Sequence, residues 1–240
     1  MKIKNPFRGL NTFEWCLWLT SLVVVSLSFL LVPRKDLLTL TSSLIGVTAL
    51  IFNAKGNPIG QALIIVFSTI YGIISFRFTY YGEMITYVGM TLPMAVTALV
   101  TWLKNPYEKS RAEVKVNRVS GREIAFLLVL SVAVTAVFYF ILKTFGTANL
   151  LPSTLSVTTS FIAAYLTFRR SAYFALAYAV NDVVLIVLWS LASAVDRSYI
   201  SVLICFLVFL INDLYGFFSW QRMERRQKNG EGQIIKQQAR

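Results

Sequence analysis

Long apolar stretches alternate with short polar connections along almost the whole chain. A helix needs about 17–25 mostly apolar residues to cross a bilayer, and eight stretches are of this kind. They cover residues 13–32, 37–53, 59–78, 85–103, 124–142, 150–168, 172–191 and 200–220. The pattern predicts an all-α integral membrane protein with eight transmembrane helices and little chain left for a soluble domain.

Composition and charge agree with this prediction. Of the 240 residues, 56% are hydrophobic and 14% are charged, whereas a soluble domain has about 25% charged residues. A soluble enzyme or a DNA-binding module is therefore excluded. Eight alternating helices would place 18 of the 23 Lys and Arg residues on one side of the membrane. Because cytoplasmic loops are rich in these residues, we predict that both termini are cytoplasmic. The net charge of +12 then reflects this bias and not a nucleic-acid partner.

Residues suited to catalysis are scarce. The sequence has no histidine, the commonest general base and metal ligand. It also has no Gly-rich phosphate loop and no metal-ligand spacing, so we predict no catalytic residue, no metal and no cofactor. Cys16 and Cys205 lie in apolar stretches and are expected to be buried thiols, not a disulfide. A membrane enzyme with Asp182 and Asp213 as a carboxylate pair is the remaining enzymatic alternative.

An internal repeat relates the second to fourth predicted helices to the sixth to eighth. Residues 43–49 resemble residues 158–164, and a cation follows each segment at the same spacing, at Lys55 and Arg170. Four helices separate the two triplets, so equivalent helices point the same way. The sequence therefore predicts a parallel repeat, in which a linker helix inverts the chain between the triplets.

Each triplet ends on a hydroxyl residue followed by a tryptophan, Trp102 or Trp220. The expected organisation is an extra first helix followed by a 3+1+3 parallel repeat. Its parts are a cytoplasmic N-terminus with the extra helix (1–36), a first three-helix bundle (37–103), a cytoplasmic loop with the linker helix (104–149), a second three-helix bundle (150–220) and a basic cytoplasmic tail (221–240). In transporters with such repeats the substrate site lies between the halves, near the membrane midplane.

Two Asn-Asp dipeptides stand inside predicted spans, Asn181-Asp182 and Asn212-Asp213. Polar residues are costly there and mark functional sites. Adjacent residues diverge by about 100° on a helix, so one member of a pair is expected to face a cavity while the other bonds a neighbouring helix. The structural alternative is that all four hold helices together.

Aromatic residues accompany the dipeptides, with Tyr178 and Trp189 in the middle of their span. Aromatic rings stack on a flat heterocycle, and amide and carboxylate groups bond sugar hydroxyls. No Lys or Arg lies deep in a span, which disfavours charged nucleotides. These residues favour an unphosphorylated nucleoside or a vitamin as ligand.

The chain resembles the PnuC-type bacterial vitamin transporters over roughly residues 10–222. The resemblance rests on the order and spacing of several segments, which are Tyr80-Tyr81-Gly82-Glu83, Thr101-Trp102, 155–167 with Arg169-Arg170, Asn181-Asp182 through Trp189, and Leu214-Tyr215-Gly216 through Trp220. It implies a SWEET-like fold in the bacterial inner membrane. It also implies uptake of nicotinamide riboside by facilitated diffusion, followed by phosphorylation by a cytosolic kinase, and it is compatible with a homo-oligomer such as a trimer.

Carried over by position, the resemblance places Asn181, Asp182, Tyr215 and Gln61 at the substrate site, and Asn212 is a further candidate. Where nicotinamide riboside carriers show a tryptophan pair, this chain has Tyr173 and Tyr178 with Phe174 between them. Stacking is kept, but the identity of the base stays open among nicotinamide riboside, deoxynucleosides, thiamine and riboflavin. Proton-coupled transport through Asp182 is an alternative mechanism.

Overall fold

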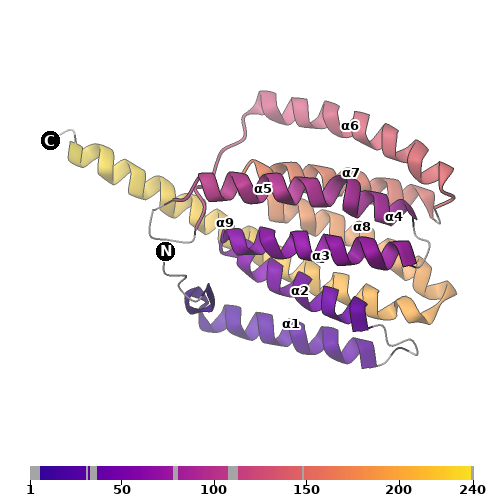
Figure 1. The fold of residues 1–240 in the computed structure, drawn as a ribbon. Helices are drawn as coiled ribbons and strands as arrows, with labels where there is room; N and C mark the ends of the chain where they lie inside the picture. The colour runs from indigo at the N-terminus through magenta and orange to yellow at the C-terminus, as the bar shows by residue number, and fades with distance from the viewer. Residues whose placement is uncertain are drawn as a thin grey trace.

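The computed structural model describes residues 6–30, 32, 37–77, 81–107, 113–147 and 149–238. Within this part of the chain, eight helices are long and apolar enough to cross a membrane, as the sequence predicts. Figure 1 shows them side by side in one bundle, with the start of α1 and the end of α9 at the same end. We call this end the termini end.

The elements follow one another with short connections. In chain order they are η1 (Pro6–Gly9), α1 (Thr12–Leu30), α2 (Leu37–Ala54), α3 (Pro58–Arg77), α4 (Tyr81–Thr86), the π-helical η2 (Tyr87–Thr91), α5 (Leu92–Lys104), α6 (Gly121–Thr144), α7 (Leu150–Phe168), α8 (Phe174–Val195), η3 (Arg197–Tyr199) and α9 (Ile200–Gln238). Together α4, η2 and α5 form the fourth span, which starts at Gly82 and not at the predicted residue 85.

A π-helical turn interrupts the fourth span immediately before Pro93. Proline lacks the N–H group that would bond the carbonyl four residues earlier, and its ring crowds that carbonyl. The kink expected at this proline takes the form of the wider turn η2, Tyr87–Thr91. A turn of this kind bends a helix and often lies at a functional site. Here it directs Tyr87 and Thr91 to the interior of the bundle.

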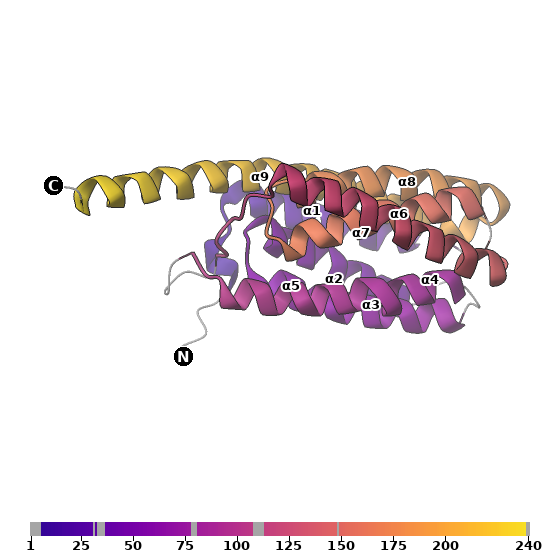
Figure 2. The same cartoon turned by 90° about the horizontal axis from the view of Figure 1, so that it is seen from above.

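Two helical triplets form the bundle, as the predicted repeat requires. In the first, α3 packs against α2 and against α4 and α5; in the second, α8 packs between α7 and α9. The triplets meet where α2 contacts α9 and where α5 contacts α7. Figure 2 shows α3, α4 and α5 on one side and α8 and α9 on the other.

The two remaining helices flank this core. Helix α1 packs against α2 and α9, and α6 packs against α7. Both carry exposed apolar side chains such as Leu27 and Val132, which suit a lipid environment. Cys205 is buried as expected, but Cys16 is exposed, because α1 packs on one face and leaves the other open.

Reciprocal tryptophan hydrogen bonds join the triplets at the termini end. The indole of Trp102 donates to the carbonyl of Thr167 in α7 at 2.9 Å, and that of Trp220 donates to the carbonyl of Asn53 in α2 at 2.7 Å. The ring centroids of the two tryptophans are 5.4 Å apart, and Phe174 packs against both. Each triplet thus ends by binding the first helix of the other.

The turns after α2 and α7 are also equivalent. Each contains a residue of positive φ, Gly56 at 63° and Arg170 at 57°, whose N–H bonds a carbonyl in the last helical turn. Lys55 therefore matches Arg169, one residue from the Lys55–Arg170 pairing that the sequence suggests. A left-handed residue that ends a helix in this way is usually glycine, so Arg170 departs from the usual pattern.

Residues 113–120, which we call the strap, cross the termini end between α5 and α6. The strap bonds the turn after α2 through Val114 N–H and Gly56 O (2.9 Å), and the turn after α7 through Asn117 N–H and Arg170 O (2.9 Å). Gln227 of α9 accepts from Val116 N–H (2.8 Å) and donates to the carbonyl of Val114 (3.0 Å). Ion pairs of Arg118 with Glu224 and of Arg226 with Glu113 add to these contacts. The segment predicted as a tail is therefore a helical extension of α9 as far as Gln238.

Candidate functional site

A cavity of about 110 Å³ lies between the two triplets. Both triplets line it, and Leu142 and Thr147 from the end of α6 and the following connection also reach it. Its polar and aromatic lining residues are Asn53, Gln61, Phe67, Tyr71, Glu83, Thr86, Tyr87, Thr91, Thr147, Ser153, Ser156, Ser160, Phe174, Tyr178, Asn181, Asp182, Trp189, Phe206, Phe209 and Asp213. The cavity therefore lies where the parallel repeat predicts a site, at the interface of the halves.

Two amide side chains are fixed by neighbouring helices. Gln61 donates to Asn53 across the α2–α3 pair at 2.9 Å. The side-chain oxygen of Asn181 accepts bonds from Thr159 (2.7 Å) and Ser160 (3.0 Å) of α7. Because these hydroxyls occupy its oxygen, Asn181 offers its amide N–H group to the cavity, where it can bond a hydroxyl or carbonyl oxygen of a ligand.

Aromatic rings form one side of the cavity. Tyr71 lies 5.6 Å from Phe67 and 4.4 Å from Tyr87, measured between ring centroids. Trp189 belongs to the same buried cluster as Phe67 and Tyr71, and its ring packs against Tyr199 with 5.4 Å between ring centroids. The buried indole N–H of Trp189 has no acceptor among the described residues. The lining thus combines stacking surfaces with an unused donor.

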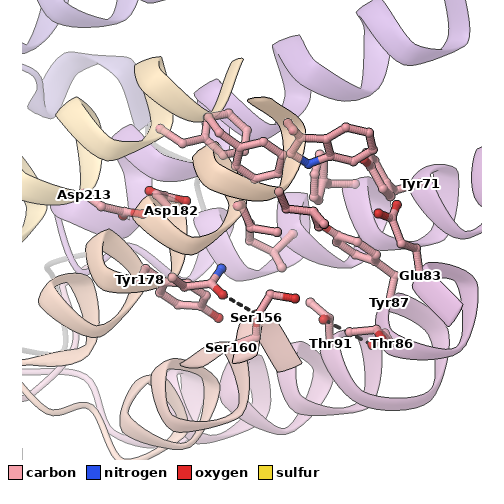
Figure 3. A pocket seen from close by; sticks show the side chains of 18 of the residues that line it. Tyr71, Glu83, Thr86, Tyr87, Thr91, Ser156, Ser160, Tyr178, Asp182 and Asp213 are labelled. Carbon is pink, nitrogen blue, oxygen red and sulfur yellow. Dashed lines mark hydrogen bonds between the residues drawn. The ribbon is translucent and has the colours of Figure 1, made fainter. Parts of the chain in front are cut away.

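Three carboxyl groups line the cavity, Glu83 from α4, Asp182 from α8 and Asp213 from α9. Figure 3 shows Asp182 and Asp213 together on one side, and Glu83 beside Tyr71 and Tyr87 on the other. No Lys or Arg is among the described residues of the lining. The fixed charge that this cavity can carry is therefore negative.

Five of the eight predicted site residues line the cavity, namely Gln61, Tyr178, Asn181, Asp182 and Trp189. Both members of the first Asn-Asp pair do so, whereas the second pair divides as expected. Asp213 lines the cavity, while Asn212 donates to Ser21 of α1 at 3.0 Å and to Val208 O at 2.8 Å.

The structure places the other two predicted residues elsewhere. Tyr173 is exposed and packs against Phe217. The hydroxyl of Tyr215 donates to Glu14 of α1 at 2.6 Å. Glu14 is 1% exposed and also pairs with Lys55 at 3.0 Å. Tyr215 therefore belongs to a polar cluster at the termini end, because that face of α9 is covered by α1.

Several lining residues were not among the predicted site residues. Ser153, Ser156 and Ser160 occur at helical spacing on one face of α7, and this periodicity was visible in the sequence. Asn53 ends an apolar stretch and gave no comparable signal. Glu83 was assigned to a connection, because the predicted fourth span began two residues after it.

The fold and the cavity define a class of protein, a multi-pass helical membrane transporter with its site between two parallel triplets. A family model described as "Nicotinamide mononucleotide transporter" matches residues 36–222. The chain belongs to this family of membrane transporters and is not an enzyme. Among curated proteins it is similar to the nicotinamide riboside transporter PnuC of Neisseria mucosa, with 22% identity over 227 residues that cover 93% of this chain and 86% of that protein.

The fold is also that of a solved structure. A crystal structure of the vitamin B3 transporter PnuC matches with a TM-score of 0.79 and 22% identity, over 91% of this chain and 94% of that one. The arrangement of helices around the cavity is therefore that of PnuC.

Proposed function

We propose that this protein takes up nicotinamide riboside by facilitated diffusion. One observation carries the proposal: the cavity between the triplets is lined by three carboxyl groups and by aromatic rings packed against one another, and its described lining contains no Lys or Arg. The similarity to the nicotinamide riboside transporter of Neisseria mucosa supports it.

The charge of the lining separates the riboside from its phosphate ester. A phosphate group is bound by Arg, Lys or the N-terminus of a helix, and Glu83, Asp182 and Asp213 would repel it. The nicotinamide ring of the riboside carries a positive charge. Such a ring is attracted both by carboxylates and by aromatic faces, and Tyr71 and Tyr87 supply such faces close to Glu83. The lining favours the riboside over the mononucleotide in the family description.

Sugar hydroxyls are matched by the amide groups. The N–H group of Asn181 and the Asn53–Gln61 pair offer donors and acceptors from opposite triplets. A ligand that touches both triplets favours movement of one against the other, which is the rocking motion of alternating access. We therefore assign Asn181, Gln61 and Tyr178 to substrate binding, together with Asp182 and Trp189.

Orientation and partners complete the proposal. The excess of Lys and Arg at the termini end favours a cytoplasmic position for both termini, and the family resemblance favours the bacterial inner membrane. A facilitator only equilibrates its substrate, so net accumulation requires a cytosolic kinase that phosphorylates the riboside. We also propose a homo-oligomer, such as a trimer, on the grounds of the family resemblance.

Thiamine is the second candidate, because it shares the cationic aromatic ring. Deoxynucleosides and riboflavin are neutral and do not use the carboxyl groups in this way.

Binding to the detergent-purified protein, measured by calorimetry, tests the order of preference. We expect nicotinamide riboside to bind most tightly and nicotinamide mononucleotide not to bind. Preference for thiamine or for deoxyadenosine would change the proposed substrate but not the fold. If none of these compounds binds, the assignment of the site is refuted.

A further inference from the structure

Two buried carboxyl groups from different helices meet in the wall of the cavity. Asp182 of α8 is 3% exposed and Asp213 of α9 is 5% exposed. They lie close enough for a hydrogen bond between the two carboxyl groups, and Figure 3 shows them next to each other. Two carboxylates in contact cannot both be charged without a compensating group, and such pairs hold one proton between them.

Among the residues that the structure describes, none supplies a compensating positive charge to the pair. The other titratable groups that face it are Tyr178 of α8, Tyr87 of η2 and Cys205 of α9, none of which is a cation. No N–H or hydroxyl donor within the described part of the chain reaches Oδ2 of Asp182. Both residues line the cavity, and the pair holds a buried acceptor without a donor among the described residues, which a proton or a cationic ligand can satisfy.

We propose that Asp182 and Asp213 share one proton when the cavity is empty, and that a cationic ligand displaces this proton on binding. The proton leaves through the cavity to water, and both carboxylates then face the cation. The charges balance, because the pair with one proton carries −1, and the pair with two carboxylates and one bound cation also carries −1. Net charge in the membrane interior is therefore the same with and without ligand. The inference rests on the proposed uptake of the riboside. It names the charge of the ligand and the carboxyl pair that binds it, and it turns the facilitated diffusion proposed above into an exchange of one cation for one proton.

Competition between ligand and proton gives the affinity a defined pH dependence. In the pH range where the empty pair holds its proton, each unit of acidification should raise the Kd of a cationic ligand up to tenfold. At higher pH, where the proton is already lost, the Kd should become constant. A neutral ligand of the same shape should show neither the proton release nor the change in Kd.

Calorimetry on the full-length protein tests this directly. Nicotinamide riboside is titrated at one pH in two buffers with different enthalpies of ionisation, and the difference in heat gives the number of protons released. The matched ligand is the dihydronicotinamide riboside, which has nearly the same shape and no positive charge. We expect up to one proton released per cation bound and none per neutral ligand.

Variants locate the source of the proton. The double variant Asp182→Asn, Asp213→Asn should abolish proton release and weaken binding of the cation more than binding of the neutral ligand. Asp196→Asn, a change of the same kind in the exposed connection before η3, should leave the proton count as it is. If the double variant does not fold, the comparison of the two ligands on the unaltered protein still decides.

Two negative results have different meanings. Tight binding of nicotinamide riboside without proton release, or equal release with the neutral ligand, would overturn the shared-proton inference and leave the proposed function standing. No binding of either ligand at any pH would instead refute the proposed function.

Discussion

The reciprocal tryptophan bonds predict that Trp102→Phe and Trp220→Phe destabilise the protein to a similar extent. Both indoles are 0% exposed. Each carbonyl that they bind also accepts a backbone bond, from Gly56 N–H at Asn53 and from Arg170 N–H at Thr167. Neither carbonyl would therefore be left without a partner, and the loss of each indole bond should cost about 1 kcal/mol.

The smaller ring adds a packing cost. Phenylalanine lacks two carbons of the indole, which at about 0.8 kcal/mol per buried carbon is roughly 1.5 kcal/mol. Each variant should then lose about 2–3 kcal/mol. At about 2–4 °C per kcal/mol for a chain of this size, thermal unfolding in detergent should shift down by roughly 5–10 °C in both variants.

A third tryptophan provides the control. Trp15 is half-buried at the start of α1 and stacks on Phe7 at 5.8 Å, so Trp15→Phe should shift the melting temperature by less than either change. A large shift in melting temperature for Trp220→Phe with no shift for Trp102→Phe would refute the equivalence of the two triplets at this end. Shifts in both variants that are no larger than that of Trp15→Phe would also refute it.

Three further changes test the site and the fold. Asn181→Leu should abolish ligand binding in calorimetry, and because it removes the acceptor of Thr159 and Ser160 it should also lower the melting temperature modestly. Asn212→Ala should lower the melting temperature and keep the affinity; loss of binding in Asn212→Ala with retained binding in Asn181→Leu would exchange their roles. Gly60→Ala should reduce the yield of folded protein by size-exclusion chromatography, because its Cβ would lie 2.2 Å from a side-chain oxygen of α2. Gly121→Ala should leave the yield unchanged, because a Cβ at this position would have no atom within 4 Å. Gln227→Ala removes the side chain that holds the strap and should speed amide hydrogen exchange in it, and unchanged exchange would show that the ion pairs suffice.

Hydropathy was enough to predict the eight spans, because lipid requires each crossing segment to be apolar over a fixed length. The repeat was visible because Trp102 and Trp220 stand at equivalent helix ends. In the structure each indole donates a hydrogen bond to the first helix of the other triplet. The length of α9 was not predicted from hydropathy. The part of α9 after Trp220 is polar, and its residues Glu224 and Gln227 contact a strap more than 100 positions earlier in the chain.

The polar part of the candidate site was predictable where a polar residue stood within an apolar span. Asn181 and Asp182 met this condition, and both line the cavity. Asn212 met it equally well, yet it bonds α1. The difference depends on which neighbour covers each face of α9, and the extra helix α1 lies outside the repeat. No periodicity within α9 itself carries that information.

Departures from the repeat bear on the selectivity proposed for the cavity. Two identical halves would present a symmetric site, but a nucleoside has a base at one end and a sugar at the other, so the lining must differ between the triplets. Counted back from the tryptophans, Asp213 corresponds to Ala95, which is buried and apolar. The carboxyl pair therefore belongs to the second triplet alone, while the tryptophans at the termini end remain equivalent. Symmetry is kept where the triplets must bind each other, and it is lost where the ligand must be oriented. The exchange Ala95→Asp with Asp213→Ala keeps the composition but should for this reason destabilise the fold. A carboxyl group at position 95 of α5 would have no partner corresponding to Asp182 among the described residues of the cavity lining.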